Sequence, residues 1–145
     1  AQAQAQAPPA PPLASAVAPR AVGFFHDTLD HFPAAVYVLD DSGRLLTVNE
    51  EAQRLSTLLA GEPLAHLEGR WLAELDEAWL PDSMKARYQQ ALQGQSLSFE
   101  YKEQKLGAHF YLSVAPVYDG PAIEKVFFTL QDVTARQAAE SLAQR

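Results

Sequence analysis

Apolar residues recur at every second position in the second half of the chain, over residues 97–101, 110–114 and 126–130. A period of two places every second side chain on the same face, as in a strand with one buried face. Gly107 and the Asp119-Gly120-Pro121 sequence interrupt the pattern where turns are needed. The pattern therefore predicts three consecutive strands joined by tight turns.

The first half of the chain predicts a hairpin and then several short helices. Two apolar runs, 35–39 and 45–48, flank the turn sequence Asp-Asp-Ser-Gly-Arg. Asn49 comes next as a helix cap, and two glutamates occupy the first turn, where the helix dipole favours negative charge. We also expect a helical turn at 70–75 and a helix over 82–93.

The amino-terminal region divides into a tail and one amphipathic segment. Residues 1–20 contain eight Ala, five Pro and three Gln, the composition of a low-complexity tail or linker. Apolar residues then fall at Val22, Phe25, Leu29 and Phe32 with helical spacing. This spacing predicts a helix that ends at Pro33, because proline disfavours helical backbone in the residue before it.

The last strand runs into a helix with neither Gly nor Pro between them. Val126–Leu130 continues through Gln131 into a helical pattern from Asp132 onwards. A passage without a loop would make the helix move with the strand. The helical pattern is still intact at Arg145, so we expect it to lead to another part of a longer protein.

Composition excludes several classes of function. The net charge is -7, with 18 acidic and 11 basic residues and no basic stripe, so no nucleic-acid partner is expected. No apolar run approaches the roughly 20 residues of a membrane helix, so we expect a cytoplasmic domain without direct membrane contact, even if the parent protein is membrane-anchored. The chain has no Cys, which excludes disulfides and thiolate chemistry. No catalytic constellation is present, so no enzymatic activity is expected of this domain.

The order of elements and three sequence motifs resemble the PAS domain family. Residues 36–49 look like the family's first hairpin with its Asp-x-x-Gly turn and closing Asn, 69–75 like its short helix, and 132–136 like its Asp-Val-Thr junction. The resemblance implies an α+β fold with a five-stranded antiparallel sheet of order 2-1-5-4-3. Short helices would cover one face, with helices flanking the domain at both ends.

The resemblance also implies a domain division and a function. Residues 1–20 would be the tail, 21–134 the PAS domain with its leading helix, and 135–145 the start of a signalling or coiled-coil helix. Such a domain would be a sensory and dimerisation module of a bacterial signal-transduction protein, a histidine kinase or a cyclic-dinucleotide enzyme. The alternative is a ligand-free protein-interaction spacer with the same fold.

The candidate residues fall into three sets. The junction set would pass a signal to an output domain of the same chain: Asp132, Thr134 and Arg136. Thr134 could form a capping box with Gln137, and Asp132 could pair with Arg136. The second set would line an internal cavity or fill the core: Val38, Leu55, Trp71, Met84, Tyr88, Phe99, Phe110, Leu112, Phe128 and Leu130. The third set would form homodimer contacts on the flanking helices: Val22, Phe25, Leu29, Ala135, Ala138 and Leu142.

No cofactor or metal is expected. The histidines His26, His31, His66 and His109 lack the spacing of a metal site and are interpreted as surface residues. The helix over 82–93 carries no His, which disfavours haem. The lack of Cys excludes a flavin-thiol adduct and a thioester chromophore, whereas a noncovalent flavin or a small metabolite remains open.

Overall fold

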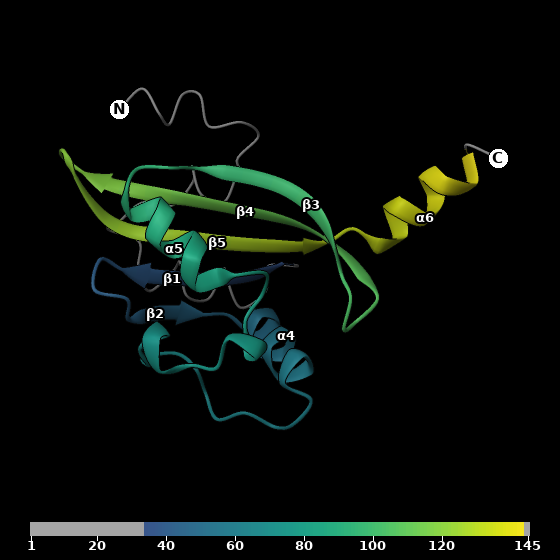
Figure 1. Cartoon of the computed structure of the whole chain (residues 1–145), viewed down its shortest axis with the longest axis horizontal. Coiled ribbons are helices and arrows are strands. Elements are labelled where there is room, and N and C mark those ends of the chain that lie inside the picture. The colour runs from purple at the N-terminus through teal and green to yellow at the C-terminus, as the bar shows by residue number, and fades with distance from the viewer. Residues whose placement is uncertain (1–33, 144–145) are drawn as a thin grey trace.

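The computed structural model describes residues 34–143, which contain a five-stranded antiparallel sheet of order β2-β1-β5-β4-β3 (Figure 1). The predicted strand order is therefore confirmed. The strands are β1 (Ala35–Asp40), β2 (Leu45–Val48), β3 (Leu97–Glu103), β4 (Ala108–Asp119) and β5 (Ala122–Asp132). The predicted helix over 22–32, with Val22, Phe25 and Leu29, lies outside the described residues.

Three α-helices and two short 3₁₀ helices complete the described part of the chain. They are α4 (Glu50–Ala60), η2 (Leu72–Glu74), η3 (Glu77–Trp79), α5 (Met84–Leu92) and α6 (Thr134–Ala143). The elements between β2 and β3 form one connected cover on the sheet, whereas α6 extends away from it (Figure 1). Within residues 34–143, no helix combines the length and apolarity needed to cross a bilayer.

The β1–β2 turn is held by its own aspartate and by α5. The Asp40 carboxylate accepts hydrogen bonds from the backbone N–H groups of Ser42 (2.8 Å) and Arg44 (3.0 Å). Gly43 adopts a φ of 93°, a backbone conformation that disfavours residues with a Cβ. The Tyr88 hydroxyl donates to the Asp40 carbonyl at 2.6 Å. The turn predicted from composition is thus also a docking point for α5.

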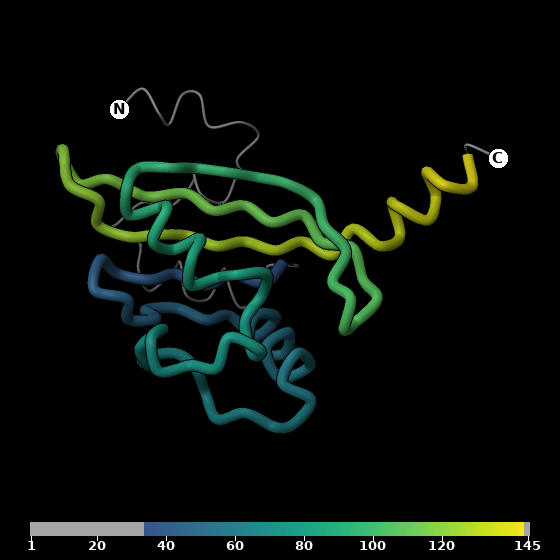
Figure 2. Tube along the Cα trace, viewed as in Figure 1, coloured from purple at the N-terminus to yellow at the C-terminus, as the bar shows by residue number. Residues whose placement is uncertain are grey.

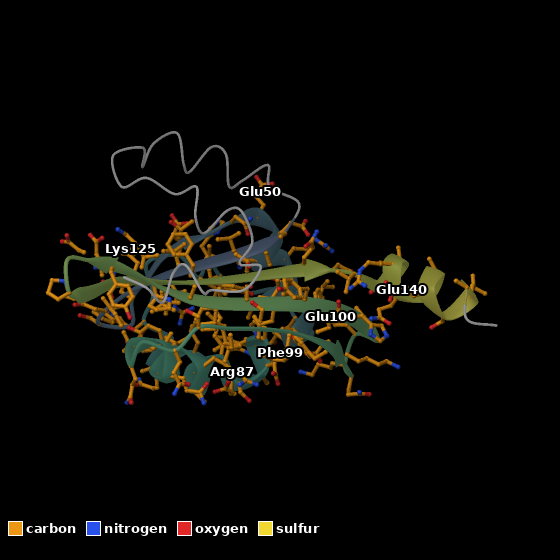
Figure 3. The ribbon with its side chains drawn as sticks, turned by 90° about the horizontal axis from the view of Figure 1, so that it is seen from above. Glu50, Arg87, Phe99, Glu100, Lys125 and Glu140 are labelled. Carbon is orange, nitrogen blue, oxygen red and sulfur yellow. The ribbon has the colours of Figure 1, made fainter. Side chains whose placement is uncertain are left out.

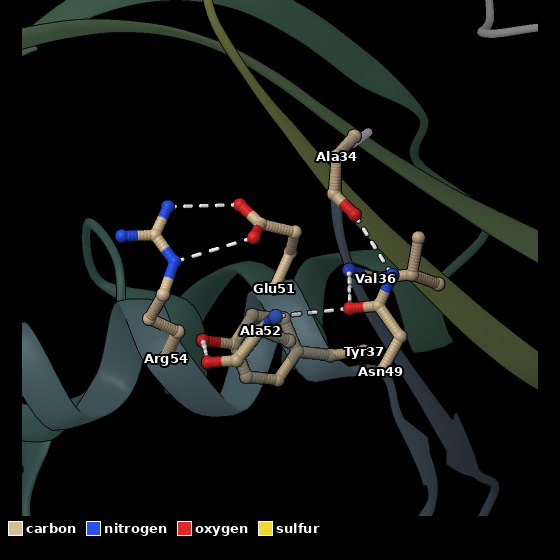
Figure 4. Close-up of polar contacts among 7 residues, drawn as sticks. All are labelled: Ala34, Val36, Tyr37, Asn49, Glu51, Ala52 and Arg54. Atoms are coloured by element: carbon tan, nitrogen blue, oxygen red, sulfur yellow. Dashed lines mark hydrogen bonds and ion pairs between the residues drawn. The ribbon is translucent and has the colours of Figure 1, made fainter. Parts of the chain in front are cut away.

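Asn49 joins α4 to β1, as Figure 4 shows. Its side-chain oxygen accepts from the N–H groups of Ala52 and Val36, both at 2.9 Å. Its side-chain nitrogen donates to the Ala34 carbonyl at 2.8 Å. The predicted helix cap is therefore confirmed, and the same side chain fixes where the helix sits on the sheet.

One face of the sheet, which we term the inner face, packs on α4, α5 and the connecting segments. Tyr37 is fully buried there, and its hydroxyl lies 3.0 Å from the Ala52 carbonyl and 2.7 Å from the Ser56 hydroxyl. Burial raises the pKa of Tyr37 well above its ordinary value. From the predicted core set, the cluster contains Leu55, Met84, Tyr88, Phe110, Leu112, Phe128 and Leu130, with Phe99 partly buried against it.

The remaining two residues of that set do not belong to the inner face. Val38 is buried, but it alternates with Tyr37 and Leu39, which belong to the inner cluster, so it points to the opposite side of β1. Trp71 is 42% exposed, and the Arg44 guanidinium lies 5.9 Å from its ring centroid. Trp71 forms an isolated antiparallel bridge with Arg44, the residue just before β2, instead of entering the core.

The opposite side of the sheet, which we term the outer face, has two rows of paired residues at its centre, flanked along β5 by Lys125 and Gln131. The rows are Thr47, Val38, Phe127, Ala115 and Val36, Thr129, Ser113, Ser98. None of these residues belongs to the inner cluster, to which α4 and α5 contribute. Figure 3 shows α5, carrying Arg87, on the inner side of the sheet.

Candidate functional site

The passage from β5 to α6 consists of a single residue. β5 ends at Asp132 and α6 begins at Thr134, so only Val133 lies between them. The Val133 N–H donates to the His109 carbonyl of β4 at 2.8 Å, and its carbonyl accepts from the Gln137 N–H at 2.9 Å. The linking residue is thus bonded to both the sheet and the helix, and the trace in Figure 2 passes between them without a loop.

Thr134 binds the sheet rather than capping its own helix. Its hydroxyl oxygen accepts a hydrogen bond from the His109 N–H at 2.9 Å, while Asp132 accepts from the Thr134 N–H at 2.9 Å. The predicted capping box with Gln137 is therefore wrong, because β4 supplies the donor for the threonine. The consequence is a second hydrogen bond between β4 and the start of α6.

Arg136 contacts two glutamates and does not form the predicted pair with Asp132. One guanidinium nitrogen lies 2.8 Å from Glu140, and the other bonds to Glu100 on β3. Gln137 donates to the second oxygen of the same Glu100 carboxylate at 2.7 Å. The first turn of α6 is thereby tied to the edge strand β3. Figure 3 labels Glu100 on β3 and Glu140 on α6.

We term this set of residues the junction clasp: Glu100, His109, Thr134, Arg136 and Gln137. Hydrogen bonds from Gln137 and Arg136 lower the pKa of Glu100. Bonds to Glu140 and then Glu100 raise the pKa of Arg136. Glu100 is not predicted from sequence, because it is one charged residue on the exposed side of an alternating strand. His109 is half-buried and contributes its backbone N–H and carbonyl groups to the clasp.

The predicted dimer face of α6 is open to solvent. Ala135, Ala138 and Leu142 are all exposed, and Leu142 retains 65% of its accessible surface. An exposed leucine on a short helix that leaves the sheet is compatible with packing on another helix, so dimerisation remains a prediction.

A crevice of about 260 Å³ lies beside the junction. It is lined by Leu55 and Leu58 of α4, Phe110 of β4, and Leu130 and Asp132 of β5, among others. Its lining combines aliphatic side chains with the charged Glu51, Arg54 and Asp132, so it would suit a small molecule with both apolar and polar parts. Among residues 34–143, no three His, Asp or Glu side chains gather as a metal site.

A larger open groove, of about 900 Å³, runs between β2 and α4. Its polar lining includes Asn49 and Gln53, whose amides already bind backbone groups. Gln53 holds the 64–67 segment against α4 by accepting from the Leu67 N–H at 3.0 Å. These amides have structural roles. A ligand in the groove would therefore contact mainly the exposed side chains at its rim.

The fold and the clasp define a class of domain: a helix-covered antiparallel sheet whose last strand continues into an outgoing helix. A family model described as the PAS fold matches residues 29–138, so the chain belongs to the PAS domain family. The resemblance carried by the three sequence motifs is thereby confirmed. No curated protein matched the chain in sequence.

Solved structures give the same fold at low sequence identity. The PAS domain of BvgS from Bordetella pertussis is 23% identical, with a TM-score of 0.56, covering 86% of this chain and 93% of that one. A sensory box sensor histidine kinase from Vibrio cholerae is 19% identical, with a TM-score of 0.53 and coverage of 79% and 94%. The photoactive yellow protein domain of a sensor histidine kinase from Rhodospirillum centenum is 15% identical, with a TM-score of 0.52 and coverage of 79% and 99%.

Proposed function

We propose that this chain is the sensory and dimerisation module of a bacterial signal-transduction protein, and that its signal leaves through β5 into α6. The junction clasp carries this proposal. A single residue separates strand and helix, and the start of α6 is bonded to both β4 and β3. A shift of these strands would therefore turn or tilt the helix rather than be absorbed by a loop.

The position of β5 supports the same direction of transfer. β5 lies between β1 and β4, and its Phe128 and Leu130 are buried in the inner cluster. A change in packing around these residues would act on the strand only a few positions before Asp132. Interiors are densely packed and transmit small displacements. A stimulus would therefore change the packing on the inner face, and the resulting movement of β5 would reach α6 at the junction.

The structural neighbours suggest the kind of output domain that α6 would lead to. Two of them belong to sensor histidine kinases, so we infer an output domain of this kind, or a cyclic-dinucleotide enzyme, in the same protein. The domain itself would be regulatory and cytoplasmic. A homodimer would place two α6 helices side by side through Ala135, Ala138 and Leu142. An isolated helix of this length is marginal in water, which favours a partner.

Basal kinase activity tests the proposed transfer even while the stimulus is unidentified. For this test, a fusion protein is made in which α6 continues into a histidine kinase. In one variant of the fusion, Gly-Gly is inserted after Val133. We expect a changed autophosphorylation rate, because the insertion separates α6 from its partners His109 on β4 and Glu100 on β3. The free energy of unfolding should fall by no more than about 1–2 kcal/mol, the cost of the broken hydrogen bond to His109. The matched control inserts Gly-Gly after Gly120, in the β4–β5 turn. Equal rates in both variants and the parent would refute transfer through the junction.

A ligand-free spacer is the second candidate function. The inner cluster favours this function, because its large side chains Tyr37, Met84 and Phe128 are all completely buried and fill the space between the sheet and the helices. In this case no cofactor would be held, whereas the sensory function admits a noncovalent flavin or a small metabolite. Native mass spectrometry and an absorbance spectrum of the purified protein separate the two. A bound mass or a visible chromophore would eliminate the spacer.

A further inference from the structure

The turn between β3 and β4 is fastened to α4 at the crevice beside the junction. The Lys105 ammonium group of this turn donates a hydrogen bond of 2.6 Å to the Leu59 carbonyl in the last turn of α4. The last carbonyl groups of a helix lack partners within the helix, and the helix dipole favours a cation beside them. Leu106, the next residue of the turn, lines the crevice opposite Leu58 of α4. The contact of Lys105 therefore holds two walls of the crevice together.

The register of the sheet places a carboxylate at the rim of an apolar floor. Asp132 pairs with Phe110 on β4 and follows Leu130 in the alternation of β5, so its side chain lies on the inner side of the sheet. Phe110 and Leu130 are buried, whereas Asp132 is exposed. Leu55 and Leu58 supply the facing side of the crevice. A ligand would thus find aliphatic and aromatic groups below and a charged group at the opening.

The charges at this rim do not balance. Glu51, Arg54 and Asp132 are the charged residues in the lining. Arg54 donates to both oxygens of Glu51, at 3.2 and 2.9 Å, so these two side chains neutralise each other (Figure 4). The Asp132 carboxylate accepts the Thr134 N–H through Oδ1, and no cation among residues 34–143 forms an ion pair with it. The rim therefore retains one negative charge at Asp132.

Size and charge together narrow the class of ligand. The volume of about 260 Å³ lies below the range of about 300–1,000 Å³ for drug-sized ligands, so the crevice suits a small molecule. An anion would be repelled by the rim. A neutral apolar molecule would take water from the Asp132 carboxylate without replacing its hydrogen bonds, which is unfavourable. An ammonium group on an apolar body avoids both costs.

We propose that this crevice binds a small organic cation, an amine attached to an apolar body. The ammonium group pairs with Asp132, and the body lies on Leu58, Phe110 and Leu130. Asp132 is the last residue of β5, so the bound cation lies beside the start of α6. The inference supplies a ligand class for the proposed sensory function, and any effect of the ligand on output rests on that function.

An NMR titration of the full chain with phenethylamine, used as a probe amine, tests the site. We expect saturable shifts of the amide signals of Leu58, Leu130 and Asp132. The probes 2-phenylethanol and 3-phenylpropanoate carry the same phenylethyl group on a neutral and an anionic head, and both should bind at least about fivefold more weakly. No saturable binding of the amine, or equal binding of all three probes, would overturn the proposal. The proposed signal transfer would survive that result, because the Gly-Gly insertion tests it without a ligand.

Two variants with matched controls assign the binding to this crevice. Asp132→Asn removes the charge but keeps an acceptor for the Thr134 N–H, and Asp119→Asn, at the end of β4, is its control. We expect the affinity for phenethylamine to fall at least about fivefold in the first and to stay unchanged in the second.

The second variant places a cation at the opening of the crevice. Leu58 is 47% exposed, so Leu58→Lys leaves the core intact, and Leu46→Lys, at the 37% exposed leucine of β2, is the control. Leu58→Lys should weaken the binding of phenethylamine at least about fivefold, because the lysine repels the amine and competes for Asp132. Unchanged affinity in either Asp132→Asn or Leu58→Lys would place the amine elsewhere and overturn the proposal.

Discussion

Glu100 on β3 accepts a hydrogen bond of 2.7 Å from Gln137 on α6, although the two residues are 37 positions apart. Arg136 binds the other oxygen of the same carboxylate. One side chain of an edge strand thus holds the first turn of the outgoing helix. Because these groups are exposed, the contact contributes little to stability, and its main effect is on the orientation of α6.

Replacing Glu100 with Gln should loosen α6 without unfolding the domain. The change removes the charge that binds Arg136 and weakens the contact with Gln137. We expect the free energy of unfolding to change little, because these charged groups are exposed to solvent. Amide hydrogen exchange in α6 should become faster, while exchange in β4 and β5 stays unchanged.

Glu140→Gln is the control for this variant. It removes the pair between Arg136 and Glu140 within α6, while both contacts to Glu100 remain. If both variants changed exchange in α6 equally, the contact to β3 would have no special role.

Thr134→Val should destabilise the junction, and Thr134→Ser should not. Valine keeps the shape of threonine but leaves the His109 N–H without its acceptor, which costs about 1–2 kcal/mol at a partly buried site. Serine retains the oxygen. Urea unfolding of the three proteins measures the difference. Equal stability of the valine and serine variants would show that this hydrogen bond does not hold the helix.

Asn49→Ala should be more damaging than the changes at Glu100 and Thr134. It leaves two backbone N–H groups and the Ala34 carbonyl without their partner inside the protein. We expect a loss of about 2 kcal/mol or more. Asn49→Asp keeps both acceptor contacts and loses the donor, so its stability should lie between those of the alanine variant and the parent. A loss for alanine no larger than for aspartate would contradict this assignment.

Alkaline pH should destabilise the domain through Tyr88. Burial, together with the nearby Asp40 and Asp41, raises the pKa of Tyr88 from its ordinary value of 10.0 to about 12. Because folding raises this pKa, the neutral Tyr88 side chain stabilises the folded state fully below pH 10.0. That stabilisation is lost as the pH rises through about 12. Unfolding free energies measured across this range should fall less steeply in Tyr88→Phe. Equal slopes in variant and parent would assign the pH effect to other groups.

Local sequence patterns predict most of the fold. Alternation in β3, β4 and β5 identifies strands and their inward positions, and the type and position of Asn49 identify it as a cap. β1 cannot be oriented in this way, because Ala-Val-Tyr-Val-Leu is apolar at every position. The choice of face then depends on tertiary partners such as Ser56, which binds Tyr37. Val38 is therefore buried, as expected, but on the outer side of β1 and not in the inner cluster.

The sequence predicts the position of the candidate site but not its contacts. The absence of Gly and Pro locates the junction at Asp132 and Thr134, because continuity is a local property. The partners of Thr134 and Arg136 come from β4 and β3, and no spacing in the sequence brings these strands to the start of α6. Local rules therefore favour a capping box and an Asp132–Arg136 pair, whereas the sheet supplies closer partners.

The single residue between β5 and α6 also sets a rotational phase. Successive side chains of a helix are rotated by about 100° about its axis. The direction of Leu142 therefore depends on how many residues separate it from the end of β5. One residue added after Val133 would swing that direction by about a quarter turn, whereas seven would nearly restore it. The junction thus sets the angular direction of α6, and a change of chain length at this point would change the direction in which its apolar side faces.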